Sequence, residues 1–204
     1  MLFLNFYSAC SPRICNNEEI NLSNVFIFHG YGADPSANWF PWLKEQLEAK
    51  GYTVFVPAFP DTNNPDREKW LKHMEQYKEH ITEDTIFVGH SLGAPFILNI
   101  LETLDKPIKA SFFVAGFASS IGPDFDPHVG SISIRNFNWD KIKQNCKKFV
   151  IFASDNDPYV PLEKAEELHK LLPSELVIIK GGEHLNLGSG YFTFDELRDS
   201  IFSS

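Results

Sequence analysis

Six short apolar runs, separated by amphipathic stretches, constrain the fold of this 204-residue chain most strongly. The runs cover residues 25–28, 52–56, 85–88, 110–114, 149–152 and 176–179. Because they are apolar throughout rather than alternating, they are typical of parallel strands buried on both faces. The alternation of such runs with helical stretches predicts an α/β domain. We expect three layers, with a mostly parallel central sheet of about six strands and helices on both faces.

The stretches between the runs carry apolar residues at helical spacing. We expect helices over residues 39–50, 70–81, 162–172 and 194–201, and a deeply buried helix after Ser91. Residues 116–139 have no clear periodicity and contain Gly-Pro and Asp-Pro pairs, so we expect a long loop with little regular structure, where a lid would lie. Residues 24–204 then form a single domain, and residues 1–23 form an irregular N-terminal extension.

Composition excludes several classes of function. The net charge of −9 argues against nucleic acid and against anionic lipid, because both require a basic surface. No apolar stretch approaches the ~20 residues of a membrane helix, and residues 1–10 lack the basic start of an export signal. The three cysteines match no metal pattern and are typical of incidental thiols in a reduced cytoplasmic protein. We expect no metal and no cofactor, and no protein partner is indicated.

The sequence Gly89-His90-Ser91-Leu92-Gly93 follows the third apolar run and precedes the buried helix. This G-x-S-x-G pattern between a strand and a helix is a nucleophile elbow, in which a serine is held on a tight turn between small neighbours. Ser91 could instead be an ordinary helix N-cap between two glycines. The strand before it and the apolar helix after it favour the elbow.

A serine nucleophile needs a base and an acid, which follow it in the chain order Ser, acid, His. His184 comes directly after the last apolar run, in Lys180-Gly181-Gly182-Glu183-His184, and is the expected base. The preceding run is followed by two carboxylates, Asp155 and Asp157. We select Asp157, because the pattern D-x-x-V-P is a frequent form of the acid turn, and keep Asp155 as the alternative.

Two backbone N–H groups are needed to hold an oxyanion. We expect Leu92, next to the nucleophile, to supply one and Tyr31, in the glycine-rich loop after the first run, to supply the other. His29 beside this loop suits structural hydrogen bonding. Aromatic residues from loops at the same edge could line an acyl pocket; the candidates are Phe59, Phe117, Phe125 and Tyr159.

Several stretches resemble the small serine hydrolases related to retinoblastoma-binding protein nine, also called YdeN-like α/β hydrolases. They are HGYGADPSANWFPWLKEQL (29–47), FPDTNNPDREKW (59–70), FVGHSLGA (87–94), SDNDPYVP (154–161) and GGEH (181–184). The resemblance implies an α/β-hydrolase fold without a large cap domain and the triad Ser91, Asp157 and His184. Members are similar to esterases and amidases. The residues before Val25 depart from the family, whose chains begin almost at the first strand.

These elements predict a serine hydrolase that cleaves carboxylic esters or amides of small acyl groups through an acyl-enzyme on Ser91. Two alternatives share the same fold. One is a non-catalytic module that binds a protein or a ligand, since fold does not dictate function. The other is an acyltransferase that uses the same three residues with an acceptor other than water.

Overall fold

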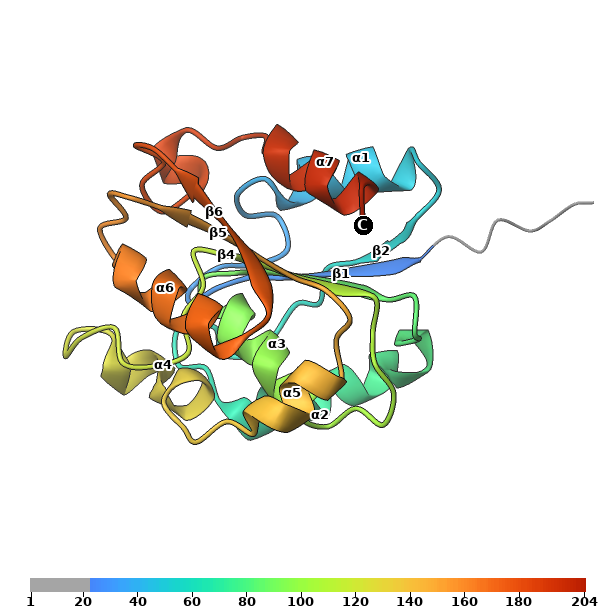
Figure 1. Cartoon of the computed structure of the whole chain (residues 1–204), viewed down its shortest axis with the longest axis horizontal. Coiled ribbons are helices and arrows are strands. Elements are labelled where there is room, and N and C mark those ends of the chain that lie inside the picture. The colour runs from blue at the N-terminus through green and yellow to red at the C-terminus, as the bar shows by residue number, and fades with distance from the viewer. Residues whose placement is uncertain (1–22) are drawn as a thin grey trace, which may run out of the picture.

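A parallel sheet of six strands forms the centre of the molecule, in the order β2-β1-β3-β4-β5-β6 (Figure 1). The computed structural model describes residues 23–204. The strands are β1 (Asn24–Phe28), β2 (Thr53–Phe55), β3 (Ile86–His90), β4 (Ala110–Val114), β5 (Phe149–Ser154) and β6 (Ser174–Ile179). Every neighbouring pair is parallel, so all the strands end at the same edge. The predicted α/β class, strand number and parallel order are confirmed.

Burial along the strands depends on their place in the sheet. β3, β4 and β5 are buried at every residue, and β1 at all but its first, as their continuous apolar runs predict. β6 is an edge strand without a fully buried residue, and its exposed positions include Ile178. β2, the other edge strand, is buried only at Val54. The expectation of two-sided burial was therefore wrong for the second and sixth runs, because an edge strand has a neighbouring strand on one side alone.

Helices cover both faces of the sheet, as predicted (Figure 1). One face carries α1 (Phe40–Glu48) and α7 (Asp195–Phe202), and the other carries α2 (Arg67–Met74), α3 (Gly93–Leu101), α4 (Asp126–Ser133), α5 (Trp139–Gln144) and α6 (Leu162–Leu171). Two separate apolar cores result, one on each side of the sheet. All nine residues of α3 are buried, which confirms the deeply buried helix expected after Ser91.

One predicted helix and one predicted loop differ from the structure. The helix expected over residues 70–81 ends at Met74 and continues as the 3-10 helix η1 (Glu75–His80), which has no buried residue. The segment 116–139 is not a plain loop, because it contains α4 and the start of α5. Pro127 occupies the first turn of α4, where its missing N–H costs nothing, and Val129 and Ile132 bury one face. Two apolar residues are too few to produce a visible period in the sequence.

Residues 23–204 include no large cap domain, and the excursion between β4 and β5 is limited to α4 and α5. A further 3-10 helix, η2 (Leu187–Ser189), follows β6. Within residues 23–204 no helix has the length and apolar character needed to cross a bilayer. Cys146 is a buried free thiol. Cys10, Cys15 and the remainder of the expected N-terminal extension up to residue 22 lie outside the described residues.

Candidate active site

Ser91 occupies the sharp turn between β3 and α3, with a left-handed backbone (φ 52°). A positive φ is uncommon for a residue with a side chain and is strained unless the surroundings impose it. Here the Ser91 N–H donates to the carbonyl of Val114 at the end of β4 (2.9 Å), which ties the turn to the sheet. The serine thus has the backbone conformation that the elbow motif predicts.

The two motif glycines allow close approach of backbone rather than an unusual φ. A Cβ on Gly89 would lie 2.6 Å from the carbonyl carbon and oxygen of Gly93. A Cβ on Gly93 would lie 2.2 Å from the carbonyl oxygen of Phe28 in β1. Since both contacts are with backbone, neither can be relieved by moving a side chain. Any other residue at these positions would separate α3 from the strands beneath it.

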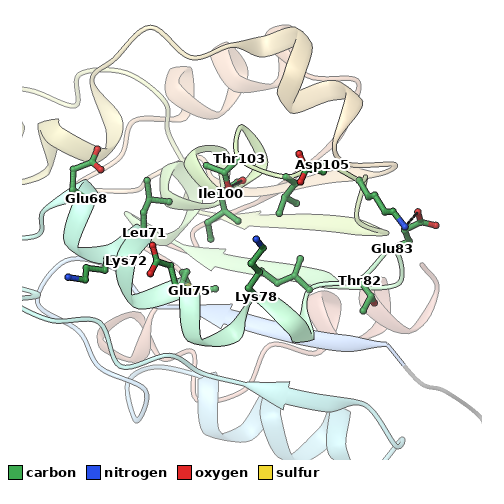
Figure 2. A pocket seen from close by; sticks show the side chains of 14 residues that line it. Glu68, Leu71, Lys72, Glu75, Lys78, Thr82, Glu83, Ile100, Thr103 and Asp105 are labelled. Atoms are coloured by element: carbon green, nitrogen blue, oxygen red, sulfur yellow. Dashed lines mark hydrogen bonds and ion pairs between the residues drawn. The ribbon is translucent and has the colours of Figure 1, made fainter.

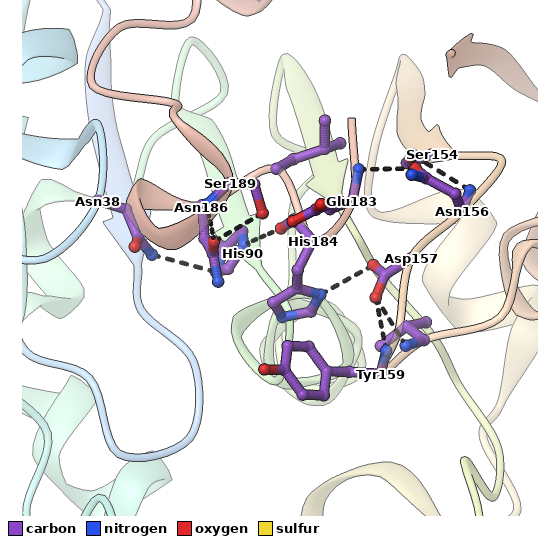
Figure 3. A network of polar contacts seen from close by, with 12 residues as sticks. Asn38, His90, Ser154, Asn156, Asp157, Tyr159, Glu183, His184, Asn186 and Ser189 are labelled. Atoms are coloured by element: carbon purple, nitrogen blue, oxygen red, sulfur yellow. Dashed lines mark hydrogen bonds and ion pairs between the residues drawn. The ribbon is translucent and has the colours of Figure 1, made fainter. Parts of the chain in front are cut away.

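Three consecutive residues after β5 hold the loop after β6, and Figure 3 shows most of this network. The Asp155 carboxylate accepts from the N–H of Gly181 (2.7 Å). The Asn156 side-chain oxygen accepts from the N–H of Glu183 (2.8 Å). Asp157 Oδ2 then contacts Nδ1 of His184 at 2.8 Å.

The two aspartates therefore differ in what they contact. Asp157 pairs with the imidazole, and its other oxygen accepts from the N–H groups of Tyr159 (2.8 Å) and Val160 (3.0 Å). Asp155 contacts backbone alone, which is a loop-holding interaction. The geometry thus matches the choice of Asp157 over Asp155. Asn156, which completes the set, carried no signal in the sequence.

The Asp157–His184 pair is sheltered from solvent. The Asp157 side chain is 2% exposed and the His184 side chain 9%. Because a carboxylate accepts, the His184 Nδ1 must carry the proton, and Nε2 of the neutral ring is left as a base. Within residues 23–204 the structure records no hydrogen bond between this ring and the Ser91 hydroxyl, a contact that commonly tightens when substrate binds.

His90 is next to Ser91 in the sequence and contacts the loop after β6 that carries His184. Its Nε2 lies 3.0 Å from the backbone oxygen of His184, and the two rings are 4.9 Å apart. His90 is 3% exposed, as expected for a residue beside the elbow. The pKa of His90 is lowered to about 3, mainly because the ring is buried and to a smaller extent because His184 is close. His90 therefore stays uncharged at neutral pH.

The loop after β1 lies against the nucleophile. A Cβ on Gly30 would lie 3.0 Å from Cβ and 3.4 Å from Oγ of Ser91. In the described part of the chain, the structure gives no hydrogen-bond acceptor to the N–H of Tyr31, which follows, or to that of Leu92. Among the described residues, neither of the two predicted oxyanion donors therefore has a protein acceptor for its N–H. Leu92 follows Ser91 in the sequence, and Tyr31 follows Gly30, which lies against Ser91.

His29 has the structural role expected for it. It is fully buried, its Nδ1 donates to the carbonyl of Gly30 (3.1 Å) and its Nε2 accepts from the N–H of Phe59 (3.2 Å). Burial is the largest cause that lowers the pKa of His29. This neutral ring holds the Gly30 loop in place.

The four aromatic pocket candidates separate into two groups. Phe59 (5% exposed) stacks on Trp70, and Phe117 (1% exposed) packs in the same core, so we correct both to core residues. Tyr159 lies 5.0 Å from the His184 ring and 5.9 Å from Phe125, measured between ring centroids. Phe125 and Tyr159 are therefore the two candidates that remain beside the site.

His128 of α4 was missed in the sequence. Its ring lies 5.5 Å from that of Tyr31, so α4 and the residue before it contact both sides of the site: the Tyr31 loop through His128 and the Tyr159 loop through Phe125. The helix thus spans the region that the sequence assigned to a lid.

A cavity of about 750 Å³ lies elsewhere, between α2, η1 and the end of α3 (Figure 2). Its lining includes Leu71, Lys78 and Ile100, and none of the residues around Ser91. It is therefore distinct from the site formed by the strand ends.

The parallel sheet, the strained serine between β3 and α3 and the His–Asp pair from the last two strands define the α/β-hydrolase class. Residues 25–202 match the family model described as serine hydrolase, and the chain belongs to that family. It is 32% identical over 181 residues to YdeN of Bacillus subtilis (strain 168), which covers 88% of this chain and 94% of YdeN. It is 30% identical over 149 residues to the serine hydrolase RBBP9 of Rattus norvegicus, covering 72% and 78%.

Solved structures agree with the family. The crystal structure of the ydeN gene product from B. subtilis matches with a TM-score of 0.84 and 30% identity, over 89% of this chain and 97% of that one. Est1E from Butyrivibrio proteoclasticus, at 17% identity and a TM-score of 0.68, covers 89% of this chain and 88% of its own and shares the fold.

Proposed function

We propose that the protein hydrolyses carboxylic esters or amides of small acyl groups through an acyl-enzyme on Ser91. The observation that carries the proposal is the pairing of a left-handed serine at the elbow with a buried Asp157–His184 hydrogen bond at the same sheet edge. A serine that served as a helix N-cap would need neither the strained backbone nor this pair.

The first half-reaction forms the acyl-enzyme. Ser91 Oγ attacks the carbonyl carbon while Nε2 of His184 takes the hydroxyl proton. Asp157 keeps the other ring proton on Nδ1 and stabilises the imidazolium that forms. The N–H groups of Tyr31 and Leu92 hold the negative oxygen, and the imidazolium then gives its proton to the leaving alcohol or amine.

The second half-reaction returns the enzyme to its starting state. Water replaces the leaving group, gives a proton to His184 and attacks the acyl carbonyl. Collapse of the second tetrahedral intermediate releases the acid and returns the proton to Ser91. No step requires a metal or a cofactor.

The aromatic residues beside the site are the basis for proposing small acyl groups. Tyr31 and Tyr159 are 37% and 46% exposed, and each lies beside an aromatic ring of the 125–128 segment: Tyr31 beside His128 and Tyr159 beside Phe125. With Phe59 and Phe117 in the core, Phe125 and Tyr159 are the aromatic residues that we propose for contact with the acyl group. We take this limited aromatic surface to favour small acyl groups over long ones.

Labelling with a fluorophosphonate probe tests the mechanism. We expect wild-type protein to be labelled once, at Ser91, and Ser91→Ala to be unlabelled with an unchanged melting temperature. A p-nitrophenyl ester series from acetate to dodecanoate then tests the substrate class, with turnover expected to fall beyond short chains. Folded wild-type protein that takes no label would overturn the proposal, and label on a different residue would overturn the assignment of Ser91.

The same assay with added alcohols or amines tests the acceptor. We expect free acid as the main product at each acceptor concentration. A product in which the acyl group is transferred to the added alcohol or amine would indicate acyl transfer by the same three residues.

A further inference from the structure

Two side chains from other parts of the chain, Asn38 and His90, contact each other and the loop that carries His184. The N–H of Leu187 donates to Oδ1 of Asn38 (3.2 Å), and Nδ2 of Asn38 lies 3.5 Å from Nδ1 of His90. The opposite ring nitrogen of His90 lies 3.0 Å from the carbonyl oxygen of His184. Figure 3 shows how Asn38 and His90 stand beside this loop.

The direction of each hydrogen bond is fixed by chemistry. A carbonyl can only accept, so His90 Nε2 must carry the proton, and the side-chain amide nitrogen of Asn38 can only donate, so Nδ1 must be bare. Both contacts require the same neutral tautomer of His90. Burial lowers the pKa of His90 to about 3, so the ring is uncharged near neutral pH, and its two hydrogen-bond partners select this tautomer.

The loop needs such support because of its own backbone. Glu183 and Leu185, on either side of His184, both have left-handed conformations (φ 49° and 50°). Neither residue type favours that region, so the surrounding contacts must impose it. A third side chain contributes, since the indole N–H of Trp39 donates to the carbonyl of Leu185 (3.0 Å).

We infer that His90 is a positioning residue: through its Nε2–H it holds the backbone of His184, and so sets the position of the imidazole relative to Ser91, the residue next to it in sequence. The inference rests on the proposed function. Because one residue adjoins the nucleophile and contacts the base, the distance between the two reacting groups is fixed locally. A displacement of about 1 Å in such a pair costs on the order of 100-fold in rate.

Two variants at position 90 separate the hydrogen bond from the ring. His90→Phe keeps a planar ring but removes the donor, whereas His90→Gln places an amide N–H close to the position of Nε2. Asn38→Gly tests the other end, since glycine accepts the left-handed backbone of Asn38 (φ 52°) and removes the contacts to both Leu187 and His90. His169→Phe, at an exposed position on α6, is the matched control.

The measurements are kcat and KM for a p-nitrophenyl ester of a short acid, the rate of fluorophosphonate labelling against pH, and the melting temperature. For His90→Phe we expect kcat and the labelling rate to fall about 10- to 100-fold with KM within about twofold. His90→Gln should recover most of that loss, Asn38→Gly should lose about 3- to 10-fold, and His169→Phe should match wild type.

Folded His90→Phe with wild-type kcat would overturn the inference while leaving the proposed function intact. So would a loss that appears in KM and melting temperature but not in kcat, because that pattern describes general support of the fold. If His90→Gln lost one limb of the wild-type pH profile, His90 would exchange protons itself, and the positioning role would be wrong. Unlabelled wild-type protein would instead remove the proposed function on which the inference rests.

Discussion

Asp157 Oδ2 lies 2.8 Å from Nδ1 of His184, and the carboxylate that makes this contact is 2% exposed. Its second oxygen is held by two backbone N–H groups, so the carboxylate cannot rotate away without breaking them. Asp155, two residues earlier, is bound to backbone on the same loop. The pair of aspartates is therefore a natural comparison, in which one variant changes the imidazole and the other changes the loop.

Asp157→Asn should reduce kcat for an activated ester by about 10³- to 10⁴-fold. The amide can present an N–H to the ring and favour the tautomer with the proton on Nε2, which is no longer a base. Asp155→Asn keeps an acceptor for the Gly181 N–H and should stay within about tenfold of wild type. Steady-state kinetics of both purified variants makes the comparison, and equal losses would contradict the assignment.

Gly93→Ala should destabilise the fold severely, by more than about 3 kcal/mol in free energy of unfolding, because the new Cβ would lie 2.2 Å from the Phe28 backbone oxygen. Gly130→Ala in α4 is the control, since its Cβ would meet nothing closer than 3.6 Å. That helical change should be neutral or stabilise by up to about 1 kcal/mol. Urea denaturation followed by circular dichroism measures both. Similar unfolding midpoints would show that the close approach is not essential.

Acid should destabilise the protein partly through His90. In the folded state the pKa of His90 is about 3, whereas an exposed histidine in the unfolded chain has a value of about 6.5. Between these values the unfolded state binds more protons, so the free energy of unfolding falls as the pH drops from about 6.5 toward 3. The contribution approaches roughly 4 kcal/mol at the low end.

His90→Gln removes this contribution because glutamine does not titrate. Its stability should therefore fall less steeply than that of wild type between pH 6.5 and 4, while His169→Gln, at the exposed control position, should follow wild type. Thermal or urea unfolding at half-unit pH steps gives the two slopes. Parallel curves for His90→Gln and wild type would mean that His90 is not held neutral.

Asn99→Leu should cost about 2–4 kcal/mol of stability. The fully buried Asn99 amide donates to the carbonyl of Ile132 in α4 (2.9 Å), and its oxygen accepts from Nε of Arg67 (2.7 Å). Leucine would leave a buried carbonyl and a guanidinium without these partners. Chemical denaturation is the measurement, and Asn64→Leu, at an exposed position, should change stability by less than about 0.5 kcal/mol.

The fold could be predicted because its main determinants are local in sequence. Runs of apolar residues identified the strands, and the glycine spacing around Ser91 identified the turn that the steric contacts of Gly89 and Gly93 now explain. Where the local signal was weak the prediction failed. α4 has two buried apolar residues, interrupted by Gly130, and so produced no helical period.

The site could be predicted less completely, because its supports join distant parts of the chain. Asp157 and His184 followed from chain order and a turn pattern. Asn38 contacts a residue 149 positions away, and its left-handed backbone leaves no mark in the sequence. Phe59 and Phe125 could not be separated either, since a phenylalanine in the core and one at a site entrance are identical until the sheet edge is known.

The parallel order of the strands has a practical consequence for handling the protein. Ser91, His184 and their supporting loops all follow the carboxyl ends of strands, whereas Asn24 begins β1 at the opposite edge and donates from its side chain to the carbonyl of His80 (2.7 Å). A support or label attached directly at the start of β1 would therefore join the molecule on the side away from Ser91. Surface-immobilised protein tethered there should present its reactive edge to the solution.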